Sequence, residues 1–185
     1  MKQLFFYLLL FATPLLTQCD DDDHAVETLP EATQTGRGIF ACLVDGKPFI
    51  DTSGSPNGIS FNAYYQLVDG EYYFNVRGTK NNNVRIGDFE TMKIATNRKS
   101  ISQDGVYQLF SDTPGNAWGG GAVNVSSTNN EFAETNQNYT GQLIITKFDI
   151  ENQIVSGTFW MNLQHPITGD TVKITEGRFD TRFGL

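Results

Sequence analysis

The chain has 185 residues, of which 39% are hydrophobic, 12% aromatic and 18% charged, and its formal net charge is −8. This length suits one domain with a core of its own, and the composition excludes a disordered or fibrous protein. From Gly36 onward there are 15 acidic and 12 basic residues, so the domain lacks a basic field and we expect no nucleic-acid partner.

Residues 1–18 have the layout of a signal peptide. Lys2 precedes an apolar run from Leu4 to Leu16, which is shorter than the roughly 20 residues of a membrane-spanning helix. The sequence Leu16-Thr17-Gln18-Cys19 resembles the lipobox of bacterial lipoproteins, in which the cysteine becomes the lipidated first residue. We therefore predict lipidation of Cys19 and a membrane partner through this lipid anchor.

Residues 19–35 are predicted to form an acidic tether. Asp20, Asp21, Asp22 and Asp23 directly follow the cysteine, and no apolar period follows. Such a cluster resembles the surface-export signal of Bacteroidota lipoproteins, which implies an outer-membrane lipoprotein exposed on the cell surface. The alternatives are a periplasm-facing protein, the inner-membrane retention that aspartate after the cysteine signals in enteric bacteria, and a solvated spacer without address function.

Residues 36–185 are predicted to form a single all-β domain. Turn signals such as Asp45-Gly46 and Asp69-Gly70 recur between stretches of period-two hydrophobicity. Candidate strands cover residues 39–44, 48–50, 59–67, 72–77, 84–89, 92–96, 106–110, 122–126, 139–150, 154–163 and 172–183. We expect an antiparallel β-sandwich of about nine or ten strands, with a closed or partly open β-barrel as the alternative.

Three details of these strands are predicted from their patterns. Leu67 and Tyr72 share the apolar face of the hairpin around Asp69-Gly70, Gly177 marks a β-bulge in the last strand, and Gly119-Gly120-Gly121 forms a mobile hairpin loop.

Two segments resemble a family of uncharacterised Bacteroidota lipoproteins that is catalogued as a domain of unknown function. The first runs from Phe40 to Lys47, and the second is the C-terminal trio of strands with Ile145 to Asp149, Val155 to Phe159 and Ile174 to Asp180. The resemblance implies no activity, ligand or catalytic residue.

Little in the sequence predicts catalysis or a metal site. His24 falls in the tether and His165 in a turn before Pro166, and Cys42 lies in an apolar run that predicts a buried thiol without a disulfide. Arg178 could pair with Asp149 or Asp180 across adjacent strands. The loop with Asp112 and Asn116 lacks the spacing of a calcium site, so we expect neither cofactor nor metal.

Two carboxylate pairs keep an enzyme hypothesis open. Glu131 with Glu134, or Asp149 with Asp180, would suit glycoside hydrolysis at the right separation, although exposed acidic residues are more common.

Aromatic side chains are the basis of the hypothesis that the domain binds a ligand. Tyr64, Tyr73 and Trp160 fall opposite the apolar faces of their strands, and Trp118 falls in the predicted glycine-rich loop. Exposed rings beside amide groups suit stacking on a sugar or a partner protein, and the alternative is that these rings cover a second sheet. The sequence favours a non-catalytic binding module for a glycan or an envelope protein. A structural accessory subunit and a small glycan-active enzyme are the alternatives.

Overall fold

The computed structural model describes residues 28–53, 62–81, 84–126 and 128–185. Within these residues the chain is all-β, and it has no helix that could cross a membrane. The strands are β1 (Ile39–Val44), β2 (Lys47–Ile50), β3 (Ala63–Val68), β4 (Glu71–Thr79), β5 (Phe89–Thr96), β6 (Val106–Phe110), β7 (Ala117–Ser126), β8 (Asn129–Glu134), β9 (Gly141–Asp149), β10 (Ile154–Gln164) and β11 (Thr171–Arg182).

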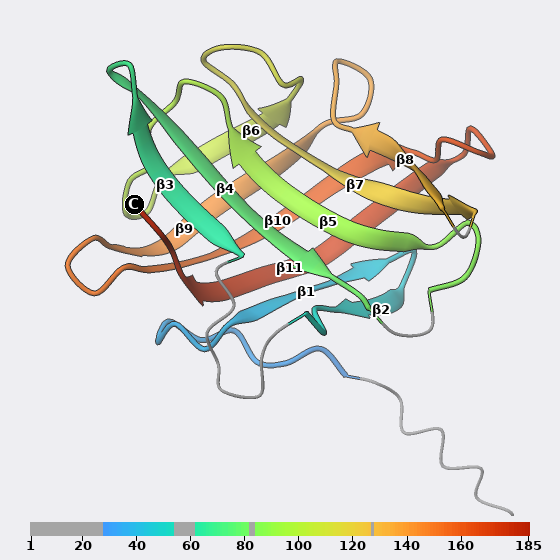
Figure 1. Cartoon of the computed structure of the whole chain (residues 1–185), viewed down its shortest axis with the longest axis horizontal. Helices are drawn as coiled ribbons and strands as arrows, with labels where there is room; N and C mark the ends of the chain where they lie inside the picture. The colour runs from blue at the N-terminus through green and yellow to red at the C-terminus, as the bar shows by residue number, and fades with distance from the viewer. Residues whose placement is uncertain (1–27, 54–61, 82–83, 127) are drawn as a thin grey trace, which may run out of the picture.

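These strands form one mostly antiparallel sheet that folds over into two facing layers (Figure 1). Its order is β2-β1-β11-β10-β9-β6-β7-β5-β4-β3, and β8 pairs with β7 outside this path. The layer with β3, β4, β5 and β7 lies in front of β9, β10 and β11 (Figure 1). Strand β6 joins the layers because it pairs antiparallel with β9 and parallel with β7. The sheet is not closed, and the arrangement is consistent with the predicted β-sandwich.

The core lies between the two layers and follows from the period-two pattern. In β10, Val155, Phe159, Met161 and Leu163 are buried on one face, as predicted. The front layer contributes apolar side chains from β4, β5 and β7 to the same cluster. At one margin, the N–H of Tyr65 donates to Gly184 O at 2.8 Å, which ties the chain after β11 to strand β3.

The structure differs from the prediction in the middle of the chain. Residues 84–88 form no strand, because a turn around Gly87 precedes β5, and the missed strand β8 lies on the edge of the front layer. The predicted loop at Gly119-Gly120-Gly121 is wrong, since these residues lie inside β7. A Cβ on Gly120 would lie 2.5 Å from Ala133 O, and one on Gly121 would lie 2.5 Å from Thr91 O. The glycines therefore permit close strand contact rather than mobility.

The outer end of the β3–β4 hairpin is also more exposed than predicted. Leu67 and Tyr72 are exposed, although the alternation of their strands continues, because they lie beside the Asp69-Gly70 turn where the hairpin ends. Tyr72 stacks on Tyr65 with 4.9 Å between the ring centroids. The predicted bulge at Gly177 is confirmed, since the register of β11 shifts there against both β1 and β10.

Candidate functional site

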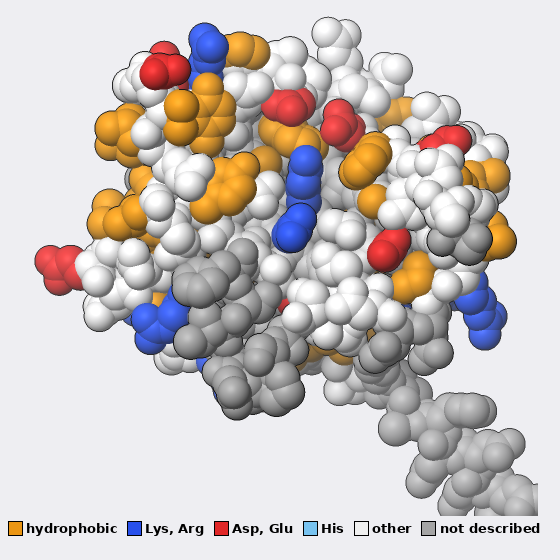
Figure 2. Space-filling view, in the orientation of Figure 1, with side chains coloured by type: hydrophobic (Ala, Val, Ile, Leu, Met, Phe, Trp, Pro, Cys, Tyr) orange, Lys and Arg blue, Asp and Glu red, His pale blue; other side chains and the backbone are white. Residues whose placement is uncertain are grey.

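Three of the four predicted aromatic residues lie on the front layer. Tyr64 is 40% exposed on β3, and Tyr73 is partly buried on β4, where its hydroxyl accepts a hydrogen bond from Arg98 Nε at 3.3 Å. Figure 2 shows this face, with basic side chains near its middle and hydrophobic ones around them. Of these two tyrosines only Tyr64 is exposed, and neither lines the two cavities described below.

Trp118 does not have the predicted exposure. It is only 5% exposed, and the Lys93 ammonium lies 3.9 Å from the centroid of its ring. Burial lowers the pKa of Lys93, while the nearby carboxylate of Glu134 opposes this shift. Because Trp118 is a strand residue beneath a lysine, its ring face is occupied by a cation and is not free to stack on a ligand.

Trp160 lies on the opposite layer, where it borders a groove on the outward face of β9, β10 and β11. Its side chain is 42% exposed, and the groove has a volume of about 340 Å³. The lining residues are Ala32, Gln142, Ile144, Thr158, Phe159, Trp160, Glu176, Gly177 and Arg178. An indole beside amide, hydroxyl and guanidinium groups is an arrangement that suits a polar ligand with one apolar face.

The bulge in β11 shapes one side of this groove. Phe159 pairs with Gly177 and Met161 with Ile174, so Trp160 lies opposite the extra residue of β11. Glu176 has a positive φ of 51°, and a Cβ on Gly177 would lie 2.5 Å from the Phe159 ring. The bulge at Thr175-Glu176-Gly177 therefore determines the backbone conformation of β11 opposite the indole.

Arg178 is held in place at the groove by three hydrogen bonds. Its Nε donates to Glu176 O at 3.1 Å, its Nη2 donates to Glu176 Oε2 at 3.3 Å, and its Nη1 donates to Pro30 O at 3.3 Å. The predicted ion pair of Arg178 with Asp149 or Asp180 is therefore wrong, because the guanidinium pairs with Glu176 on its own strand.

Ala32, near the end of the predicted tether, also lines the groove, and Asp180 binds the residues that follow it. Asp180 is 1% exposed. Its carboxylate accepts hydrogen bonds from Thr33 Oγ1 at 2.5 Å, Thr35 N at 3.0 Å, Gly36 N at 2.7 Å and Ser156 Oγ at 2.8 Å. Residues 33–36 are thereby fixed to β10 and β11, next to Ala32 in the groove.

The charge of Asp180 is stabilised by these donors. Burial by itself would raise the pKa of the carboxyl, but the hydrogen bonds from Thr33, Thr35, Gly36 and Ser156 lower it, and the net pKa lies below the ordinary value. Asp180 is thus an ionised structural residue whose oxygens are already used by the chain.

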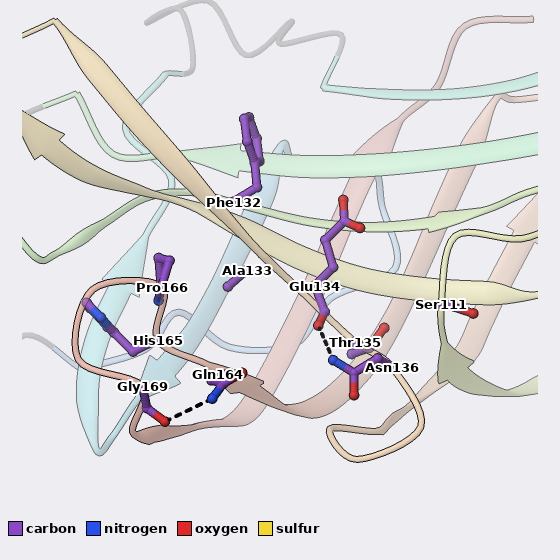
Figure 3. A pocket seen from close by; sticks show the side chains of 10 residues that line it. All are labelled: Ser111, Phe132, Ala133, Glu134, Thr135, Asn136, Gln164, His165, Pro166 and Gly169. Carbon is purple, nitrogen blue, oxygen red and sulfur yellow. Dashed lines mark hydrogen bonds between the residues drawn. The ribbon is translucent and has the colours of Figure 1, made fainter.

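A second and larger cavity lies beside β8. It has a volume of about 710 Å³, and Phe132 at its border is 69% exposed. The lining residues are Ser111, Phe132, Ala133, Glu134, Thr135, Asn136, Gln164, His165, Pro166 and Gly169. In Figure 3, Phe132 and Glu134 project to one side of β8 and Ala133 to the other, and the loop with His165 and Pro166 lies across from the strand.

His165 stabilises that loop and is not free to act as a base. Its Nδ1 accepts hydrogen bonds from the N–H groups of Ile167 and Thr168, each at 3.3 Å, and its Nε2 lies 2.9 Å from Gly87 O. The neutral imidazole with the proton on Nε2 satisfies all three contacts.

The structure does not bring the predicted carboxylate pairs into a shared cleft. Glu131 and Glu134 are three residues apart in β8, so they point to opposite faces of the sheet. Asp149 accepts hydrogen bonds from Asn152 N and Asn152 Nδ2, each at 2.9 Å, in the turn after β9. Its pKa is lowered mainly by these contacts.

The other candidate groups have structural contacts. Cys42 is buried, and burial raises the pKa of its thiol to about 12. The side chain of Asp112 accepts a hydrogen bond from Asn97 Nδ2 at 2.8 Å. Within residues 28–53, 62–81, 84–126 and 128–185, no group of three or more His, Cys, Asp or Glu side chains could hold a metal ion. Cys19, Asp20, Asp21, Asp22, Asp23 and His24 lie outside the described residues.

Comparison of the chain with protein-family models, curated proteins and solved structures finds no match. The resemblance to Bacteroidota lipoproteins stays a prediction.

Proposed function

We propose that this protein is a non-catalytic binding module of the bacterial cell envelope that binds a glycan in the groove beside Trp160. The observation that carries the proposal is that Trp160, alone among the four predicted aromatic residues, is both exposed and part of either cavity described above. An indole face with hydrogen-bonding groups around it matches a sugar ring, which has apolar C–H faces and polar hydroxyl edges.

The position of Trp160 in the sheet supports a ligand that is recognised by side chains rather than by backbone groups. Strand β10 pairs with β9 on one side and with β11 on the other, so its backbone groups are used inside the sheet. A ligand in the groove therefore meets the indole, Gln142, Thr158 and the immobilised guanidinium of Arg178. Asp149 and Asp180 already accept hydrogen bonds from Asn152 and Ser156, so this carboxylate pair is used by the fold. This supports binding of a glycan rather than its hydrolysis.

The proposal includes display on the outer membrane. Lipidated Cys19 would anchor the chain, Asp20, Asp21, Asp22 and Asp23 would direct it to the cell surface, and the rest of the tether would lead to the residues that Asp180 holds. Protease treatment of intact cells tests this part. We expect cleavage of the wild-type protein and protection of a variant with the four aspartates replaced by alanine. Protection of both proteins would place the domain in the periplasm.

A glycan array tests the binding site. We expect wild-type protein to bind a defined class of oligosaccharide, and Trp160→Ala to weaken that binding by about 30-fold, as expected for loss of a central aromatic contact. Tyr64→Ala is the matched control, because Tyr64 has a similar exposure of 40% on the other layer. Equal binding by the wild type and Trp160→Ala, or equal loss in both variants, would contradict the proposed site.

A further inference from the structure

Strand β8 presents a free backbone edge to the larger cavity. It pairs only with β7, and the register places Gly120 opposite Glu134 and Ala122 opposite Phe132. The N–H of Thr135 donates to Gly119 O at 2.9 Å, so Thr135 directs its backbone groups toward β7. Because this direction alternates along a strand, the N–H and C=O groups of Phe132 and Glu134 point away from β7.

These outward backbone groups have no partner strand in the described part of the chain. Among the described residues, no strand other than β7 pairs with β8, and Glu134 O accepts a hydrogen bond of 3.5 Å from Asn136 Nδ2 (Figure 3). A row of donors and acceptors at strand spacing is complementary to an extended polypeptide.

We propose that the free edge of β8 binds an extended segment of a partner protein, which adds as a further strand in the cavity. The side chains of β8 specify the character of this segment. Glu134 is the only charged residue among those lining the cavity, and Phe132 is the exposed aromatic ring. In an antiparallel addition, a basic residue lies opposite Glu134, and an apolar or aromatic residue two positions later lies opposite Phe132.

The shape of the cavity favours a single strand over a second copy of the domain. The loop that carries His165 and Pro166 lines the cavity across from β8, and the contact of His165 with Gly87 O fixes this loop. An isolated strand would add about 4.8 Å beside β8, whereas the edge of a second sheet would also bring its own neighbouring strand toward that loop.

The test is selection of a displayed library of random nine-residue peptides on the purified protein. We expect enriched peptides to have a basic residue two positions before an apolar or aromatic one. Phe132→Pro should weaken their binding at least about tenfold, since it removes the outward N–H and leaves the peptide carbonyl unpaired. Phe132→Ala keeps this N–H and should weaken binding less. Trp160→Ala should leave peptide binding unchanged, which separates this site from the proposed glycan site.

Three results would overturn the proposal. The first is no enrichment above an unrelated protein, and the second is enrichment of peptides that bind Phe132→Pro as tightly as wild type. The third is concentration-dependent dimerisation in sedimentation that Phe132→Pro abolishes, since this would make a second copy the occupant. Thermal unfolding of Phe132→Pro checks that the variant is folded.

Discussion

The groove beside Trp160 and the cavity beside β8 differ in what the sheet leaves available to a ligand. Strand β10 is central and has neighbours on both sides, so it offers only outward side chains to the groove. Strand β8 is at an edge, so it offers backbone groups in addition to the Phe132 and Glu134 side chains. A ligand recognised by stacking therefore suits the first site, and a polypeptide suits the second.

The largest expected effect is the loss of stability on proline substitution in β8, which tests whether one edge of this strand is free. Ala133→Pro removes an N–H that faces β7 and enlarges a side chain that is only 4% exposed, so the unpaired acceptor and the overpacking together should lower the free energy of unfolding by about 3 kcal/mol. Phe132→Pro alters the opposite edge and should cost about 1 kcal/mol or less, since proline is tolerated where the N–H faces outward. Urea denaturation measures both. Equal destabilisation would mean that Phe132 does not present a free edge.

Removal of the Asp180 carboxylate comes next. Asp180→Ala leaves donors of Thr35, Gly36 and Ser156 without their acceptor, and should lower the free energy of unfolding by about 3 kcal/mol. It should also release the segment with Ala32, which lines the groove, and so weaken glycan binding but not peptide binding. Limited proteolysis near residues 30–36 reports the release. Unchanged protection of this segment would contradict the role of Asp180.

The pattern of the sequence is sufficient for the fold class and for most strands, because buried strands keep strict alternation. From Val155 to Leu163 every second residue is glycine or apolar, and the structure places Val155, Phe159 and Met161 in the core. Strand β8 was missed because Asn129 to Glu134 contains one large apolar residue and carries two carboxylates, as exposed edges do. For the same reason the sequence does not predict that Phe132 is an exposed strand residue, and this exposure is the main feature of the second site.

The groove beside Trp160 could be predicted only in part. Alternation identifies Trp160 as outward-facing, and Gly177 indicates the bulge, but neither pattern says that residues 30–36 pack beside them. That packing depends on hydrogen bonds between Asp180 and residues more than 140 positions earlier, which no local pattern encodes. Trp118 was misplaced for a related reason, since glycines that permit close strand contact resemble a flexible loop in sequence.

Acidification gives a smaller effect than substitution of Asp180. The folded-state pKa of this carboxyl is lowered, so its stabilising contribution is complete above the ordinary pKa of about 4 and is lost as the pH falls below that value. Unfolding measured between pH 7 and pH 2 should show the difference between wild type and Asp180→Asn shrinking below about pH 4. Asp149 also has a lowered pKa, but it is present in both proteins and cancels in this difference. A constant difference would mean that Asp180 does not titrate as the structure requires.

The smallest effect concerns the guanidinium beside the groove. Arg178→Lys keeps the charge but loses the planar donors that reach Glu176 O, Glu176 Oε2 and Pro30 O together. The unfolding free energy should change by less than about 1 kcal/mol, because this pair is partly exposed. Glycan affinity should fall a few-fold, since the lysine side chain is less constrained and the contact with Pro30 O is lost, whereas peptide binding at β8 should not change. Calorimetric titration with the selected glycan and peptide measures both. A parallel loss at the two sites would mean that the groove and the edge are coupled through the sheet, and would remove the independence on which their comparison rests.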